Sequence, residues 1–221
     1  MRVLILIAHA DSTHKATAFR IAKAAEEAFD AAKIEYREVI LHEAGFDQTL
    51  TERDFIERKS DHFDYIANRV EGNIVDVIVK QEQNVAWATN ILVVGPMWYF
   101  RYPACFQAWI ERVLSGTKGE GKRVSFVISN EADEEYYSEH SPEAGSIEQL
   151  LFSEYVAFIY SKYTVTRPLG YYNAGMGKIP DPEKEKVWMA KFKKIVVDLD
   201  KWQLWGTHAN KPPLSPDTMI E

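Results

Sequence analysis

The chain has 221 residues, of which 46% are hydrophobic, and a formal net charge of −7 with a sequence pI near 5.5. A chain of this length can bury a full core as one domain spanning residues 1–221. The acidic balance argues against binding to duplex nucleic acid or to an anionic membrane surface, since both require a basic face. A small-molecule site is the better expectation.

Cysteine content and the N-terminal residues bear on the cellular compartment. Cys105 is the only cysteine, so the chain can form no intrachain disulfide and no zinc site built from several thiolates. The first apolar run, residues 3–8, is far too short for a signal peptide or a membrane span. We therefore expect a cytoplasmic protein without membrane insertion or bound metal.

Buried strands and amphipathic helices alternate in the first half of the chain. A continuous apolar run is typical of a strand covered on both faces, and apolar residues at helical spacing indicate a helix. The predicted elements are strands at 3–8, 35–41 and 90–95 and helices at 17–33 and 76–88. Residues 42–70 are polar, contain several aromatics and show no strong period.

The second half contains the clearest helix of the sequence. It begins with Pro103, ends near Gly116 and carries an apolar stripe formed by Phe106, Trp109, Ile110, Val113 and Leu114. Further predicted elements are strands at 123–129 and 163–167, a helix at 147–161, and a final helix capped by Asp181 that extends to Trp202. Residues 206–221 contain three prolines and are expected to form an extended tail.

This alternation predicts an α/β fold: a flavodoxin-like, doubly wound, five-stranded parallel sheet with helices on both faces. Ligands of such sheets bind beyond the carboxyl ends of the strands, where the strand order reverses. Three loops therefore matter, at residues 9–17, 96–102 and 130–145.

The first of these loops, AHADSTHKAT, leads from a strand to a helix N-terminus, where free N–H groups and the helix dipole attract a phosphate. Ser12, Thr13, His14 and Lys15 add polar donors. The chain lacks G-x-G-x-x-G and Walker motifs, and the loop lacks the cysteine that a tyrosine phosphatase needs. The alternative is a capped polar turn without a ligand.

The second loop, GPMWYFRYPA, places Trp98, Tyr99, Phe100 and Tyr102 on one connection. A surface loop is normally polar, so this cluster indicates either a buried corner under the last helix or a platform for a flat ligand. Cys105, which follows the loop, is expected to be a small core residue rather than a redox thiol.

AHADSTHKATA after a strand, followed by VVGPMWYFRYPACFQAWIERVL, resembles the flavodoxin-like NAD(P)H:quinone reductases. That family includes the ancillary reductases of potassium-efflux systems and bacterial drug-activity modulators. The resemblance extends from Arg2 to about Gly175. Its most specific part is the Pro-x-x-x-Phe-x-x-Pro-Ala spacing before a Trp-x-x-Arg-Val helix, with Pro96, Phe100, Pro103, Ala104, Trp109, Arg112 and Val113 at the matching positions.

The resemblance implies a flavin, FAD or FMN, reduced by NADPH or NADH. The ring site would comprise Pro96, Met97, Trp98, Tyr99 and Phe100, and the phosphate site His9, Ser12, Thr13, His14, Lys15 and Ala16. A flavin ring is large and mostly apolar, while its edge atoms need fixed donors. Such a loop supplies both.

The third loop departs from the family. Ile128-Ser129-Asn130-Glu131 replaces the usual Thr-Thr-Gly-Gly, so Ser129 and Asn130 would lie at the N1 and O2 edge of the flavin. Tyr137 matches the family's active-site tyrosine when one residue is inserted, whereas its histidine position falls on Glu143, with His140 nearby. Tyr137 and His140 are the catalytic candidates, and a solvated loop histidine is the alternative.

The expected function is hydride transfer from NAD(P)H to flavin and then two-electron reduction of a quinone or similar acceptor. The resemblance also implies a homodimer, with Phe46, Phe55, Phe63 and Tyr65 as candidate partner contacts. The tyrosine-bearing insertion that covers the quinone pocket in the animal enzymes is reduced here to residues 115–121. A more open substrate cleft, with an acceptor other than a quinone, is therefore an alternative. The competing class is a flavin-binding regulatory subunit with little turnover.

Overall fold

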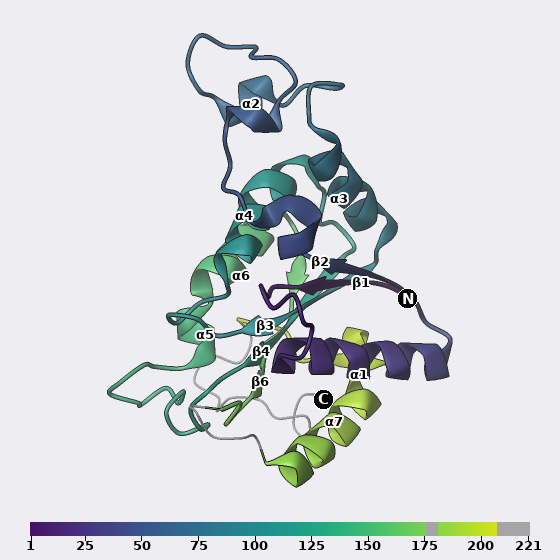
Figure 1. The fold of residues 1–221 in the computed structure, drawn as a ribbon, viewed down its shortest axis with the longest axis vertical. Coiled ribbons are helices and arrows are strands. Elements are labelled where there is room, and N and C mark those ends of the chain that lie inside the picture. The colour runs from purple at the N-terminus through teal and green to yellow at the C-terminus, as the bar shows by residue number, and fades with distance from the viewer. Residues whose placement is uncertain (176–180, 207–221) are drawn as a thin grey trace.

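The computed structural model describes residues 1–175 and 181–206. A parallel sheet in the order β2-β1-β3-β4-β5 forms the centre, and β6 pairs with β4 beyond β5 (Figure 1). The strands are β1 Arg2–Ile7, β2 Glu35–Ile40, β3 Asn90–Pro96, β4 Arg123–Ser129, β5 Thr164–Val165 and β6 Leu169–Tyr171. The predicted doubly wound α/β fold is confirmed.

Helices cover both faces of this sheet because β1 and β3 present apolar side chains on each side. One core cluster lies under α1 Thr17–Ala32 and α7 Pro182–Val196, which lie together on one side of the sheet in Figure 1. The other lies under α3 Asp76–Trp87, α4 Ala104–Val113, α5 Ile147–Leu150 and α6 Phe152–Tyr160. All five residues of the predicted stripe are buried, four of them on α4 and the fifth, Leu114, in the 3₁₀ turn Leu114–Gly116 that follows it.

The fifth strand differs from the predicted one, which spans residues 163–167 and ends before Pro168. The structure resumes pairing after this proline, as β6. Pro168 has no N–H to donate, and the Arg167 N–H donates to the Gln203 carbonyl instead of to β4. The outer edge of β5 is covered in the same region, because the Trp205 N–H donates to the Val165 carbonyl at 2.9 Å.

Two helix predictions also need correction. The segment predicted as one helix at 147–161 is interrupted at Leu151, whose φ and ψ are −94° and 18°. The last helix ends at Val196, and only a short 3₁₀ turn, Leu199–Lys201, follows it. Its cap is as predicted, since the Asp181 carboxylate accepts hydrogen bonds from the Glu183 and Lys184 N–H groups. Residues 207–221 of the predicted tail lie outside the described residues.

The aperiodic middle segment carries a π turn, His42–Phe46, a 3₁₀ turn, Glu52–Asp54, and the short helix α2, Tyr65–Asn68, at the top of Figure 1. Phe46 and Phe55 are buried within the chain, so they are not available as the partner contacts we expected. Phe63 is 45% exposed.

Within the described residues, no helix is both long enough and apolar enough to cross a bilayer. Cys105 is buried as expected, and burial raises the pKa of its thiol to about 11.

Candidate functional site

The three loops predicted to matter meet at a cavity of about 400 Å³ beyond the carboxyl ends of the strands. Its walls contain His9, Ala16, Pro96, Met97, Trp98 and Ser129 from the predicted site. They also contain Thr17 and Glu131, which belong to the predicted loops but not to the predicted site residues. The remaining wall residues, Ala18, Arg20, Ala174 and Gly175, lie outside those loops.

The first loop forms an anion-binding turn before α1, and its occupant is a carboxylate of the chain itself. Asp11 Oδ1 accepts hydrogen bonds from the N–H and hydroxyl of Thr13 at 2.9 and 2.6 Å. Asp11 Oδ2 accepts from the N–H groups of Lys15 and Ala16 at 2.9 and 3.0 Å. These hydrogen bonds hold the pKa of the Asp11 carboxyl well below its usual range. The loop thus binds an oxygen anion, as its position at a helix N-terminus predicts.

His9 connects the first loop to the aromatic loop. Its Nδ1 accepts a hydrogen bond from the Asp11 N–H at 2.9 Å, and its ring makes edge contacts with Phe19 and Trp98 at centroid distances of 5.6 and 5.1 Å. Burial lowers the pKa of His9, although the nearby Asp11 carboxylate opposes this shift. His9 is therefore positioned as a neutral wall of the cavity at neutral pH.

Ser12, Thr13, His14 and Lys15 are exposed and do not line the cavity. His14 points away from it, with its ring stacked on Phe19 at 4.6 Å and its Nε2 at 2.6 Å from Glu43 Oε1. What this segment directs toward an anion is its backbone, through the N–H groups of Thr13, Lys15 and Ala16.

The aromatic loop is a tight turn that projects its rings outward. The Trp98 N–H donates to the Arg101 carbonyl and the Arg101 N–H to the Trp98 carbonyl, at 2.9 and 3.2 Å. Tyr99 and Phe100 between them have φ values of 49° and 63°, the pattern of a type I′ turn. L-residues other than Asn and Asp rarely adopt this conformation, so the turn is strained.

Exposure of this turn excludes the buried-corner alternative. Tyr99 is 96% exposed, and Trp98 and Phe100 are each 43% exposed. Among the described residues, no protein acceptor takes a hydrogen bond from the N–H of Tyr99 or Phe100. Met97 and Tyr102 at the ends of the turn are buried and anchor it. Two exposed aromatic rings, and two backbone donors that no described residue accepts from, thus lie at the sheet end.

The end of β4 fixes the opposite wall. Ser129 accepts the Met97 N–H at 2.8 Å through its carbonyl, which ties the aromatic loop to this strand. Asn130 is fully buried, and its backbone pairs with Tyr171 and Ala174 at 2.7 and 2.8 Å, which places Ala174 at the cavity. The Asn130 Oδ1 atom has no hydrogen-bond partner within the described residues. Asn130 itself does not line the cavity, whereas Glu131 does.

The structure does not bring the two catalytic candidates together at this cavity. Tyr137 is buried beside Tyr136 and Tyr172, at ring centroid distances of 5.1 and 6.3 Å, and burial raises the pKa of its phenol. His140 is exposed, and neither residue is among those lining the cavity. The solvated-histidine alternative describes His140 in this structure.

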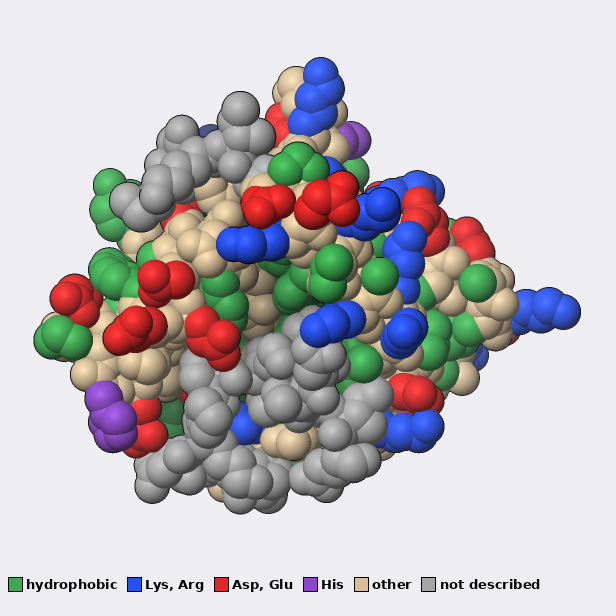
Figure 2. Space-filling model, turned by 90° about the horizontal axis from the view of Figure 1, so that it is seen from below, with side chains coloured by type: hydrophobic (Ala, Val, Ile, Leu, Met, Phe, Trp, Pro, Cys, Tyr) green, Lys and Arg blue, Asp and Glu red, His purple; other side chains and the backbone are tan. Residues whose placement is uncertain are grey.

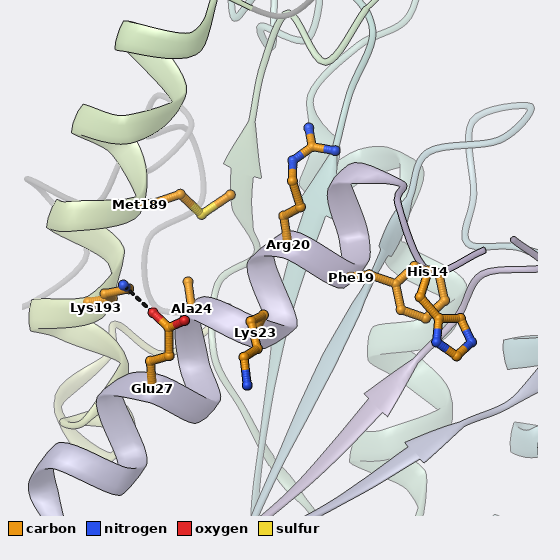
Figure 3. A pocket seen from close by; sticks show the side chains of 8 residues that line it. All are labelled: His14, Phe19, Arg20, Lys23, Ala24, Glu27, Met189 and Lys193. Atoms are coloured by element: carbon orange, nitrogen blue, oxygen red, sulfur yellow. Dashed lines mark hydrogen bonds and ion pairs between the residues drawn. The ribbon is translucent and has the colours of Figure 1, made fainter. Parts of the chain in front are cut away.

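A second cavity of about 310 Å³ lies between α1 and α7 and shares Arg20 with the first (Figure 3). Its charged groups are paired: Arg20 binds Glu185 at 2.6 Å, and Lys193 binds Glu27 at 2.5 Å. Figure 2, which views the side of α7, shows Lys and Arg side chains interspersed with Asp and Glu. This groove is therefore electrostatically mixed and does not form an open anion site of its own.

Comparison with known proteins identifies the class. A sequence model described as the flavodoxin-like fold matches residues 1–194, and the chain belongs to that family. No curated protein sequence matches the chain.

Solved structures of this fold are similar over most of the chain. A Klebsiella pneumoniae protein provisionally named a quinone reductase shares 20% identity, with a TM-score of 0.71 over 100% of this chain and 94% of its own. An NAD(P)H:quinone oxidoreductase from Methanothermobacter marburgensis shares 15%, with a TM-score of 0.69 over 90% and 97%. An FMN-dependent NADH-azoreductase from Bacillus anthracis, solved with FMN, shares 12%, with a TM-score of 0.56 over 90% and 99%. At these identities the likeness establishes the fold.

The residues present fit a flavin. The hydrogen bonds to Asp11 show that the loop amides bind an oxygen anion. In this structure the Asp11 carboxylate stands in for a phosphate. Pro96, Met97 and Trp98 supply an apolar wall, and the adjacent turn supplies two N–H donors, from Tyr99 and Phe100, that no described residue accepts from and that polar edge atoms could use.

Proposed function

We propose that this chain is a flavin-dependent NAD(P)H oxidoreductase that passes two electrons to a quinone or similar acceptor. The observation that supports it most is the pairing, at one sheet end, of an anion-binding amide loop with an outward-facing aromatic turn. A flavin mononucleotide has the matching parts, a phosphate and a flat ring. The quinone reductases and azoreductase of the same fold favour this assignment.

In this proposal the bound flavin supplies the hydride-accepting and hydride-donating chemistry. The N–H groups of Thr13, Lys15 and Ala16 would hold its phosphate, with His9, Ser12 and His14 around them. Pro96, Met97, Trp98, Tyr99 and Phe100 would form the ring site, and Ser129 and Asn130 would support its far edge. These residues act by binding and orientation, so the rate advantage would come from fixed geometry rather than from a nucleophile.

The proposal extends to FAD or FMN as cofactor, NADPH or NADH as donor, a homodimer and a cytoplasmic location. Tyr137 and His140 stay as proposed catalytic residues only through the family resemblance. For a role in turnover, the loop that carries them would have to bring them closer to the cavity than they lie in this structure.

The second candidate is a flavin-binding regulatory subunit with little turnover. The separation of Tyr137 and His140 from the cavity favours it. Steady-state NADPH oxidation with and without menadione distinguishes the two, because an enzyme accelerates oxidation in the presence of the quinone and a binding subunit does not.

We predict that the purified protein binds FMN, FAD or riboflavin with a Kd below about 100 µM, which corresponds to about −5.5 kcal/mol. Equilibrium dialysis with each flavin measures this affinity directly. Free adenosine monophosphate serves as the control, since it carries a phosphate without the flavin ring. Absence of binding by every flavin at that concentration would overturn the proposed function.

A further inference from the structure

The anion-binding amides of the site already hold an anion that belongs to the chain. Both Asp11 carboxylate oxygens are engaged, one by Thr13 and the other by Lys15 and Ala16. The position of Asp11 is fixed further by its own N–H, which donates to His9 Nδ1. With its pKa lowered by these hydrogen bonds, the carboxyl is ionised at neutral pH.

Arg20, a cation in the wall of the cavity, is likewise bound to a carboxylate of the chain. Arg20 donates from Nε and Nη2 to the two carboxylate oxygens of Glu185, at 2.6 and 2.8 Å. Its Nη1 donates to the Lys15 carbonyl at 2.6 Å, so the guanidinium lies against the amide loop. A bidentate pair of this kind is a strong one. Amides and guanidinium, the two groups that would attract a phosphate, thus each bind a protein carboxylate.

We propose that Asp11 competes with the flavin phosphate for the N–H groups of Thr13, Lys15 and Ala16, and so sets how tightly the chain holds phosphate-bearing flavins. This inference rests on the proposed function. Two anions cannot share the same donors, and their charges repel each other at contact distance. Because the competitor is intramolecular, its effective concentration is high and independent of dilution.

The proposal separates the two halves of the ligand. To reach the amides, the phosphate must displace the Asp11 carboxylate into solvent, next to the exposed residues Ser12 and Thr13. The flavin ring displaces no such group at the exposed aromatic turn. FMN therefore gains little affinity over riboflavin in the native chain. Removing the Asp11 carboxylate restores the gain that the loop's phosphate-type geometry allows.

The test compares Asp11→Ala and Asp11→Asn with the native protein, using FMN and riboflavin as ligands. Asp11→Ala is expected to tighten FMN binding by about tenfold or more, the effect of freeing charge-assisted donors. Riboflavin affinity is expected to stay within about twofold. Asp11→Asn keeps an acceptor but loses the charge, so its effect on FMN lies between. Glu131→Gln is the matched control, because it removes a carboxylate from the same cavity without touching the amides.

Thermal unfolding in inorganic phosphate makes the test independent of flavin. At matched ionic strength, phosphate is expected to raise the Tm of Asp11→Ala more than that of the native protein. If no variant binds any flavin, the proposed function fails, yet the phosphate result still decides the competition. Competition by Asp11 is overturned if phosphate stabilises both proteins equally. It is also overturned if well-folded Asp11→Ala loses FMN and riboflavin affinity in parallel, because Asp11 then only supports the loop.

Discussion

Arg112→Met is expected to lower the free energy of unfolding by about 3–5 kcal/mol, because it removes one partner of a buried ion pair. Arg112 on α4 is 5% exposed and Asp54 is 3% exposed. The guanidinium donates to Asp54 Oδ1 at 2.9 and 3.1 Å and to the Gly45 carbonyl at 2.7 Å, and it lies 4.8 Å from the centroid of the Phe46 ring. Methionine fills similar volume but leaves Asp54 Oδ1 and the Gly45 carbonyl without the donors that Arg112 provides, so that among the described residues only the Thr51 N–H still donates to the carboxylate, at Oδ2.

Urea denaturation of the ligand-free protein measures this effect. Gln107→Ala on the exposed face of the same helix is the control, and its cost should stay within about 0.5 kcal/mol. Replacing both partners, as Arg112→Met with Asp54→Leu, is expected to recover most of the loss, since no charge then stays buried alone. A loss below about 1 kcal/mol for Arg112→Met would mean that the pair does not hold the middle segment in place.

This ion pair explains why the sequence did not predict the middle segment. Residues 42–70 show no hydrophobic period because hydrogen bonds between side chains and the backbone hold much of this region together. Asn68 accepts the Lys59 N–H at 2.5 Å and donates to the Asp64 carbonyl at 2.6 Å, and both Asn68 and Asn73 are buried. Contacts such as Arg112 to Asp54, 58 residues apart, leave no local pattern.

By contrast, the buried strands could be predicted from their runs of consecutive apolar residues, and α4 from its apolar residues at helical spacing. The loops of the site followed from the strand ends. Ala174 and Gly175 have no signal in the sequence as cavity residues, because Pro168 predicts the end of the fifth strand, whereas the structure resumes pairing after it as β6. The amides of the first loop bind a carboxylate at the helix N-terminus, but no pattern in the sequence indicates that this carboxylate is Asp11.

The aromatic turn gives a second prediction, in which stability and binding change in opposite directions. Asn-Gly is the preferred pair for a type I′ turn, so Tyr99→Asn with Phe100→Gly should relieve the strain at φ values of 49° and 63°. Left-handed backbone costs L-residues about 1–2 kcal/mol each, and glycine loses about 0.5–1 kcal/mol in chain entropy. A net stabilisation of about 1–2 kcal/mol is expected for the ligand-free protein.

The same double variant is expected to weaken riboflavin binding by about 2–4 kcal/mol, because each lost aromatic contact contributes about 1–2 kcal/mol. Tyr99→Ala with Phe100→Ala is the matched control: it removes both rings, keeps non-glycine residues at positive φ, and should lose binding without gaining stability. Denaturation and equilibrium dialysis of the three proteins give both quantities. Riboflavin binding equal to that of the native chain would place the ring elsewhere, and a loss of stability in the Asn-Gly variant would show the native turn to be relaxed. A gain in stability together with a loss of riboflavin affinity would mean instead that the chain keeps a strained turn because its rings bind the flavin. Backbone strain is normally found at such functional sites.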